Sequence, residues 1–310
     1  MWDIMILLVG FVLLVWGADT FVVGASSLAT KMGISSLIIG LTVVAFGTSA
    51  PELTVSVTAG LSGSNEIAIS NVLGSNIFNM LVVVGGSAIF CKLTAEEELM
   101  KRDWVAVIAS VVVLLVCIFF DMYLSRTEGL LLMFFFVCVV GMQLRSAKKE
   151  GVAVEGKGGE KKDTRPVMIM LQIIVGIVCI VLGGEFVVDG ATGIALSMGL
   201  SETLIGLTII AIGTSLPELV TSLAAARRGE NDIAIGNAIG SCLFNILLIL
   251  GVSAVLSPIP VEMTAIFDTF ILLLVCIVLY LPAKKNILGR SVGLLAVSSY
   301  ILYTVFIILR

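Results

Sequence analysis

The chain has 310 residues, of which 59% are hydrophobic and 13% are charged; its formal net charge is −4 and it contains no histidine. A soluble domain of this size carries about 25% charged residues. The apolar residues form runs of about 20, the length of helix that crosses a bilayer. The composition therefore excludes a soluble globular protein and indicates an all-α, polytopic membrane protein. The six cysteines are scattered without metal or redox spacing, which favours a packing role.

Ten transmembrane helices are predicted from the long apolar runs and the polar segments between them. The predicted spans are 4–26, 35–60, 67–90, 104–120, 127–144, 167–190, 201–226, 232–256, 265–281 and 289–309. No basic stretch precedes the first run, so we expect a retained span rather than a cleaved leader. The long polar segment 145–166 is rich in Lys, Glu and Gly and is expected to be a solvated linker.

The basic residues are distributed unequally between the two sides of the predicted membrane helices. With the N-terminus outside, every Lys and Arg except Arg126 and Arg310 falls on the cytoplasmic side. Loops on the cytoplasmic side of membrane proteins carry an excess of basic residues. The sequence therefore predicts that both termini lie outside and that the linker 145–166 is cytoplasmic.

The chain is also a duplication, with matching residues 166 positions apart. Glu52 corresponds to Glu218 and Asn79 to Asn245, and no gap is needed. Each half, 1–144 and 167–310, holds five predicted spans; because five is odd, the second half enters the membrane inverted. Inverted repeats with interrupted helices are typical of alternating-access transporters, which bind their substrate at the repeat interface. We expect broken helices in the third and eighth spans.

The second and seventh spans each carry a lone glutamate in an apolar helix. An ionised carboxylate in hydrocarbon is costly, which indicates function. The proline before each glutamate cannot donate to the carbonyl four residues back. Carboxylates and freed carbonyls are the ligands that a hard cation prefers, and hydroxyls share the glutamate face at helical spacing. The polar candidate ligands in these spans are Thr48, Ser49, Glu52, Thr214, Ser215 and Glu218.

The third and eighth spans each carry a polar stripe with a residue every four positions. Such side chains need partners inside the bundle, so two interpretations remain open: they hold helices together, or they bind the cation. The first suits Asn71 and Asn237 as well as the second does. The cation interpretation is favoured for Ser75, Asn79, Ser241 and Asn245.

Charge balance connects the two glutamates to exchange. Two carboxylates close together in low dielectric repel, so one takes a proton or both take cations. One divalent cation or two monovalent cations neutralise the pair equally, which allows one kind of ion to replace the other. Magnesium is the weaker candidate because it dehydrates reluctantly. The lack of histidine argues against proton coupling without excluding it, since a glutamate also carries protons.

Glycines in the first and sixth spans predict closely approaching helix faces, and we interpret these two spans as a mobile gate. Four further acids lie nearer the ends of their spans. For these we expect interfacial or cavity-facing positions; they are Asp19, Glu185, Asp189 and Asp268.

Four short motifs resemble the two alpha repeats of the sodium/calcium exchanger family. They are GTSAPE at 47–52 with GSNIFN at 74–79, and GTSLPE at 213–218 with GSCLFN at 240–245. The resemblance covers both motif regions closely and extends to the whole chain through span count and linker placement. It implies a compact, prokaryotic-type member in the cell (inner) membrane, without a regulatory calcium-binding domain.

The resemblance further implies a ten-helix fold with four central ion sites in a diamond. Glu52 and Glu218 would bind calcium and also sodium, joined at the calcium site by the carbonyls of Thr48 and Thr214. Exchange would be electrogenic, with three sodium ions for one calcium, and spans one and six would slide across the core. The residues that complete the flanking sodium sites would be Ala45, Ser49, Ser75, Ala211, Ser215 and Ser241.

The sequence departs from the family pattern at two positions. Asn245 stands where some prokaryotic relatives and the potassium-dependent branch carry aspartate, so two central carboxylates remain rather than three. This favours a potassium-independent exchanger and puts the central fourth site in doubt. Cys242 replaces the usual asparagine.

The leading hypothesis is thus a sodium/calcium antiporter, not an enzyme, that needs no cofactor. Its partners would be inorganic cations and the lipid bilayer, with no nucleic acid or protein partner implied. A cation/proton antiporter is the main alternative, with both glutamates carrying protons. A cation channel or a membrane scaffold is a more remote one.

Overall fold

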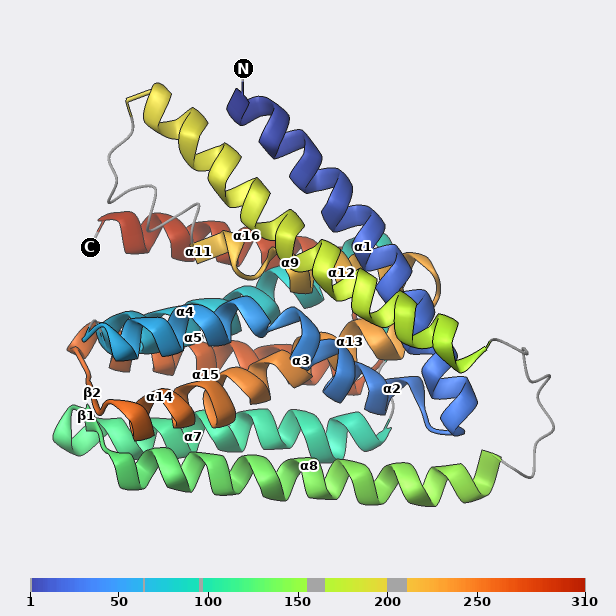
Figure 1. Cartoon of the computed structure of the whole chain (residues 1–310). Helices are drawn as coiled ribbons and strands as arrows, with labels where there is room; N and C mark the ends of the chain where they lie inside the picture. The colour runs from blue at the N-terminus through green and yellow to red at the C-terminus, as the bar shows by residue number, and fades with distance from the viewer. Residues whose placement is uncertain (1, 64, 95–96, 155–164, 200–210, 310) are drawn as a thin grey trace.

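The computed structural model describes residues 2–63, 65–94, 97–154, 165–199 and 211–309, and these ranges are almost entirely helical (Figure 1). Within them, 8 helices are long and apolar enough to cross a membrane, and a bent helix pair makes up to 9. This agrees with a polytopic membrane protein. The predicted seventh span begins in 200–210, outside the described residues; the part that is described contains α11 (Ala211–Gly213) and α12 (Leu216–Arg227).

The first and sixth predicted spans are two long helices, α1 (Trp2–Met32) and α9 (Pro166–Ser197), which pack side by side and antiparallel (Figure 1). Their glycines permit backbone contact. A Cβ atom on Gly10 would lie 2.7 Å from the Val187 nitrogen, and one on Gly190 would lie 2.7 Å from the Leu7 nitrogen. The predicted close approach is confirmed, and it joins these two helices to each other.

The second predicted span is bent where its proline stands. It consists of α2 (Ser36–Ile39), the π-helix η1 (Gly40–Val44), α3 (Ala45–Thr48) and α4 (Ala50–Leu61). The segments 36–48 and 50–61 meet at 48°. Pro51 has no N–H to give to the Gly47 carbonyl, so the helical ladder is interrupted there.

The third and eighth spans are continuous, and the prediction that they are broken is wrong. The third runs through α5 (Asn65–Phe78), the π-helix η2 (Asn79–Val84) and α6 (Gly85–Phe90). The eighth runs through α13 (Asn231–Leu243), the π-helix η5 (Phe244–Ile249) and α14 (Leu250–Leu256). Neither contains proline, so each includes a π-helical turn and continues without a break. Both are 72% buried, against at most 44% for the other long helices, and form the centre of the protein.

The remaining helices surround this centre. The π-helix η3 (Leu99–Asp103) leads into α7 (Trp104–Asp121), which is followed by α8 (Arg126–Val154), α15 (Met263–Lys284) and α16 (Arg290–Leu309). Helices α7 and α8 lie on the side of the bundle away from α1 and α9 (Figure 1). Two short strands, β1 (Tyr123–Leu124) and β2 (Ile259–Pro260), pair antiparallel with Leu124 opposite Ile259.

The predicted linker 145–166 is shorter than expected. Helix α8 continues to Val154, so residues 145–154 are helical, and α9 begins at Pro166. Ala, Lys and Glu are strong helix formers and extend an existing helix without needing to be buried. The residues 155–164 lie outside the described ranges.

Candidate cation site

Each half of the protein contributes one buried glutamate. Glu52 lies in the first turn of α4 and Glu218 in the first turn of α12. Both side chains are completely buried. Neither carboxylate forms an ion pair with a Lys or Arg of the described ranges. Two buried acids without a basic partner are costly unless protons or cations neutralise them.

Serines that cross between the halves join these two acids. The Ser49 hydroxyl donates to Oε1 of Glu218 at 2.8 Å, and the Ser215 hydroxyl donates to Oε1 of Glu52 at 2.9 Å. Each glutamate is therefore held by the half of the chain to which it does not belong. The sequence expectation that the acids meet between the halves agrees with this arrangement.

Ser75 and Ser241 extend the same pattern from the third and eighth spans. Each hydroxyl lies 3.4 Å from Oε1 of the glutamate in its own half. Each also lies 3.0 Å from the hydroxyl oxygen of a crossing serine, Ser215 or Ser49. The four predicted serines thus surround the acid pair in two equivalent sets.

The second oxygen of each acid is unused. Oε2 of Glu52 and Oε2 of Glu218 are buried and have no hydrogen-bond partner in the described part of the chain. Buried polar atoms are nearly always hydrogen bonded, so two unpartnered carboxylate oxygens at equivalent positions indicate a place where a ligand can bind. A cation bound by both would satisfy them, because carboxylate oxygens are preferred ligands of hard cations.

The two predicted asparagines lie where the π-helices begin. Asn79 is the first residue of η2, Asn245 is the second residue of η5, and both are fully buried. Both amide atoms of Asn79 lack a partner among the described residues, as does Oδ1 of Asn245. Local π turns often occur at functional sites. The unpaired amide oxygens are therefore available as neutral ligands in the buried centre of the protein.

The threonines before the prolines differ between the halves. The Thr48 hydroxyl lies within hydrogen-bond distance of two acceptors, Oδ1 of Asn237 at 3.0 Å and the Ala45 carbonyl at 3.3 Å. The buried Thr214 hydroxyl has no partner among the described residues. Ala211 lies 166 positions after Ala45 and is helical, as Ala45 is. The two threonines occupy equivalent positions, but only the Thr48 hydroxyl has hydrogen-bond partners among the described residues.

The amides for which two interpretations were open hold helices together. Asn71 donates to Oγ of Ser56 at 3.0 Å, which ties α5 to α4. Asn237 donates to Oγ of Ser222 at 2.9 Å and to the Glu218 carbonyl at 3.2 Å, which ties α13 to α12. These contacts position the helix turns that carry the acids.

One buried residue of this region was missed by sequence reasoning. Asn76 donates to the Cys242 carbonyl at 3.2 Å and accepts from Nδ2 of Asn245 at 2.9 Å. Asn76 and Cys242 are 166 positions apart, so equivalent residues of the two repeats meet where α5 crosses α13. That equivalence was the signal available in the sequence, because residues on a two-fold axis contact their own counterparts.

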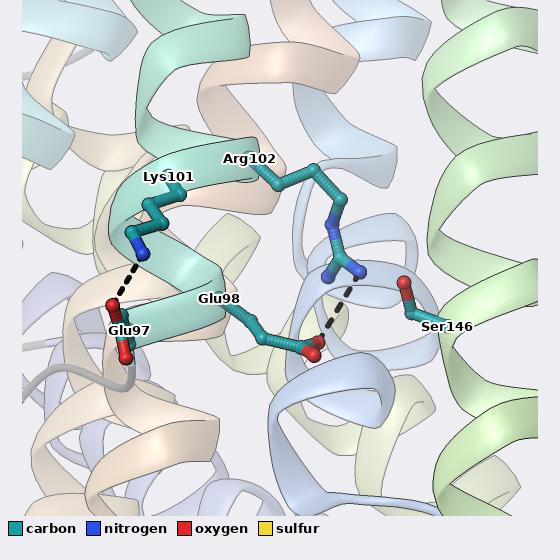
Figure 2. A pocket seen from close by; sticks show the side chains of 5 residues that line it. All are labelled: Glu97, Glu98, Lys101, Arg102 and Ser146. Atoms are coloured by element: carbon teal, nitrogen blue, oxygen red, sulfur yellow. Dashed lines mark ion pairs between the residues drawn. The ribbon is translucent and has the colours of Figure 1, made fainter.

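A polar cavity of about 440 Å³ lies where η3 leads into α7, beside α8, and differs from the acid pair in its charges (Figure 2). Its acids are neutralised locally: Glu97 pairs with Lys101, and Glu98 lies 3.7 Å from Arg102. The hydrogen bond from Lys101 also lowers the pKa of the exposed Glu97 carboxyl. Because its charges are paired and solvated, this cavity offers no vacant acid for a cation.

No group of three or more His, Cys, Asp or Glu side chains able to hold a metal occurs within the described ranges. The candidate site therefore combines two carboxylates with neutral oxygens. A site of this composition suits exchangeable hard cations better than a permanently bound transition metal, which favours nitrogen or sulfur ligands.

Comparison with known proteins agrees with this site. The sequence profile of the family described as "Sodium/calcium exchanger protein" matches residues 2–145 and 168–309. The chain is 39% identical to the putative antiporter CaxA of Alkalimonas amylolytica, over 97% of this chain and 95% of that protein. It is 33% identical to the sodium/calcium exchanger MaX1 of Methanosarcina acetivorans, over 89% of this chain and 90% of that one.

The fold is likewise similar to a solved structure. The sodium-calcium exchanger NCX_Mj superposes with a TM-score of 0.86 at 32% sequence identity, covering 97% of each chain. The profile match and these relatives extend over nearly the whole length, including both glutamate motifs. The chain therefore belongs to the sodium/calcium exchanger family.

Proposed function

We propose that the protein is a secondary antiporter that exchanges Na⁺ for Ca²⁺ across the membrane by alternating access. Membership of the family makes it an integral membrane transporter of inorganic cations rather than an enzyme. One observation carries the proposal for this chain: Glu52 and Glu218 are tied together by crossing serines, and each keeps one buried oxygen without a partner among the described residues.

The charge of the site provides the coupling. Two ionised glutamates carry a charge of minus two, which one Ca²⁺ neutralises and which two Na⁺ neutralise equally well. The serine, threonine-carbonyl and alanine-carbonyl oxygens named above would divide into calcium and sodium ligands. A third Na⁺ would make exchange electrogenic, and because Asn245 adds no charge we propose that K⁺ is not required.

We further propose that 1–144 and 167–310 are inverted repeats of five spans each, with the seventh span beginning in 200–210. Three observations support this arrangement. Helix α12 begins and ends 166 residues after α4. Asn76 and Cys242 contact each other as counterparts. The equivalent helices α1 and α9 run antiparallel.

Alternating access requires the acid pair to open to one side at a time. We propose that α1 and α9 move together as the gate, because their backbones are in contact through glycines. The distribution of basic residues supports outer termini and a cytoplasmic segment between α8 and α9. The proposed location is a prokaryotic inner membrane.

A cation/proton antiporter is the second candidate, favoured by the same unpartnered oxygens. A proton on Oε2 would neutralise a buried carboxylate as a cation does. The two mechanisms differ in which gradient drives calcium movement, so they can be separated by transport measurements.

The test is calcium uptake by purified protein in liposomes, with Na⁺, K⁺ and H⁺ gradients imposed independently. We expect uptake to follow the Na⁺ gradient at clamped pH and to be abolished in Glu52→Gln and in Glu218→Gln. The matched control, Glu97→Gln, removes an exposed acid and should transport normally. Uptake that ignores Na⁺ and follows the proton gradient would support the proton mechanism instead.

A further inference from the structure

A cavity of about 330 Å³ lies beside the acid pair, between the start of α4, the middle of α9 and the α11–α12 break. Its wall includes the carboxylates of Glu185 and Asp189, and its lining reaches Thr214 and Pro217 next to Glu218. Both acids are exposed residues. Charged side chains do not face hydrocarbon without large cost, so this cavity is filled by water rather than lipid.

The inner end of the cavity carries oxygens with unused hydrogen-bonding capacity. Pro217 cannot donate to the carbonyl of Gly213, which lines the cavity. The hydroxyl of Thr214 is buried and lacks a partner among the described residues. A buried, unpaired hydroxyl at the end of an aqueous cavity indicates a position that a hydrated cation can occupy.

The acids of the wall follow one face of α9 at four-residue spacing. Glu185 and Asp189 lie on successive turns, and a Cβ atom on Gly193, one turn further, would lie 2.6 Å from Oδ1 of Asp3. Within the described ranges, neither Glu185 nor Asp189 forms an ion pair. The part of the cavity wall formed by α9 therefore carries negative charge that no Lys or Arg of the described ranges pairs with.

The equivalent position in the other repeat is neutralised. Asp19 stands 166 residues before Glu185 and receives two 2.6 Å hydrogen bonds from Arg228. The antiparallel contacts of Gly10 with Gly183 place Asp19 and Glu185 about 16 Å apart along the helix pair. Asp19 is thus neutralised by Arg228, whereas its counterpart Glu185 lines the cavity.

We propose that Glu185 and Asp189 form an outer cation-binding site at the mouth of the ion pathway, where hydrated Na⁺ and Ca²⁺ collect before reaching Glu52 and Glu218. The inference rests on the proposed function, since it supplies ions to the same acid pair. Its ligand class is hydrated hard cations, held loosely by two carboxylates. The outer site affects how readily cations are captured from solution, whereas Glu52 and Glu218 bind the ions that are exchanged.

The physical effect is electrostatic concentration. A cleft lined by one sign of charge raises the local concentration of oppositely charged ions, and the effect falls steeply with ionic strength. A divalent cation gains more than a monovalent cation at the same potential, so calcium capture is the more sensitive measurement. Salt screens such charges over about 10 Å at 0.1 M ionic strength, so raising the salt concentration should remove the effect.

The experiment is calcium/calcium exchange in liposomes, which needs no driving gradient of a second ion. We expect the Glu185→Gln/Asp189→Asn double variant to raise the half-saturating calcium concentration about tenfold at low ionic strength, with an unchanged maximal rate. The difference should shrink to less than about twofold in high choline chloride. The control, Glu97→Gln/Glu98→Gln, removes the same charge from the cavity at α7 and should show no shift.

The outcomes separate this inference from the proposed function. A half-saturating concentration that equals that of the unaltered protein at low ionic strength overturns the outer site, whatever the sodium dependence. An equal shift at both ionic strengths also overturns it, because a structural defect is not screened by salt. A salt-sensitive shift in a protein whose calcium uptake ignores sodium supports the outer site and overturns only the coupling.

Discussion

Replacing Ser215 by alanine is the sharpest test of the crossing hydrogen bonds. The Ser215 hydroxyl donates to Oε1 of Glu52 at 2.9 Å, and its oxygen lies 3.0 Å from Oγ of Ser75. In the proposed mechanism this oxygen turns to sodium when the site is loaded, while calcium is held chiefly by the two glutamates. Alanine removes the oxygen without changing the charge of the site.

The magnitude follows from the charged partner. A hydrogen bond to an ionised group contributes about 1.5–3 kcal/mol, and about 1.4 kcal/mol corresponds to a tenfold change in an equilibrium constant. A sodium ligand of similar strength therefore accounts for at least about tenfold in sodium affinity. We expect the half-saturating sodium concentration of Ser215→Ala to rise about tenfold or more, and calcium/calcium exchange to change by less than about threefold.

The assay compares sodium-driven calcium uptake with calcium/calcium exchange in the same liposomes. Ser87→Ala is the matched control, because Ser87 is also buried in the membrane region but its hydroxyl has no partner among the described residues. Ser49→Ala should reproduce the Ser215→Ala result, since Ser49 makes the equivalent contacts. Equal losses in both assays, or a Ser215→Ala variant indistinguishable from Ser87→Ala, would refute the assignment of this serine to sodium.

Two further predictions concern packing and site charge. Gly190→Ala places a Cβ atom 2.7 Å from backbone atoms of Leu7 and Asp3. We therefore expect about 1–3 kcal/mol of destabilisation, measured as a lower melting temperature in detergent. The control Gly141→Ala adds its Cβ atom in open space and should be neutral or stabilising. Asn245→Asp adds a third buried carboxylate, so calcium uptake in liposomes should become stimulated by a further monovalent cation; an unchanged response to added K⁺ and to pH would count against this electrostatic reasoning.

Much of the architecture was predictable because the membrane restricts the choice. Hydrocarbon forces backbone groups to pair within a helix, so apolar runs such as 104–120 and 265–281 mark helices reliably. The 166-residue correspondence paired Glu52 with Glu218 and predicted that the two acids meet between the halves. An isolated glutamate in a membrane helix is costly, and the sequence alone therefore identified Glu52 and Glu218 as candidate functional residues.

Sequence reasoning erred where a local pattern has more than one structural solution. Polar stripes in the third and eighth spans suggested broken helices, whereas these spans stay continuous through η2 and η5. The break occurs instead in the second span, where Pro51 removes a hydrogen-bond donor. Helix α8 continues beyond the predicted span 127–144 to Val154, because solubility and helicity are independent properties of a Lys- and Glu-rich segment.

The sequence by itself determined the membrane class, the duplication and the two acids, since each depends on composition or on spacing along one chain. Only the tertiary structure decided which partners those residues have. Contacts between distant segments decide each of these partners. Ser49 donates to Glu218 rather than to Glu52, and Asn76 contacts Cys242. Asp19 is neutralised by Arg228, whereas Glu185 lines a cavity. Such contacts are set by how the helices cross, and helix periodicity carries no information about the residue on the neighbouring helix.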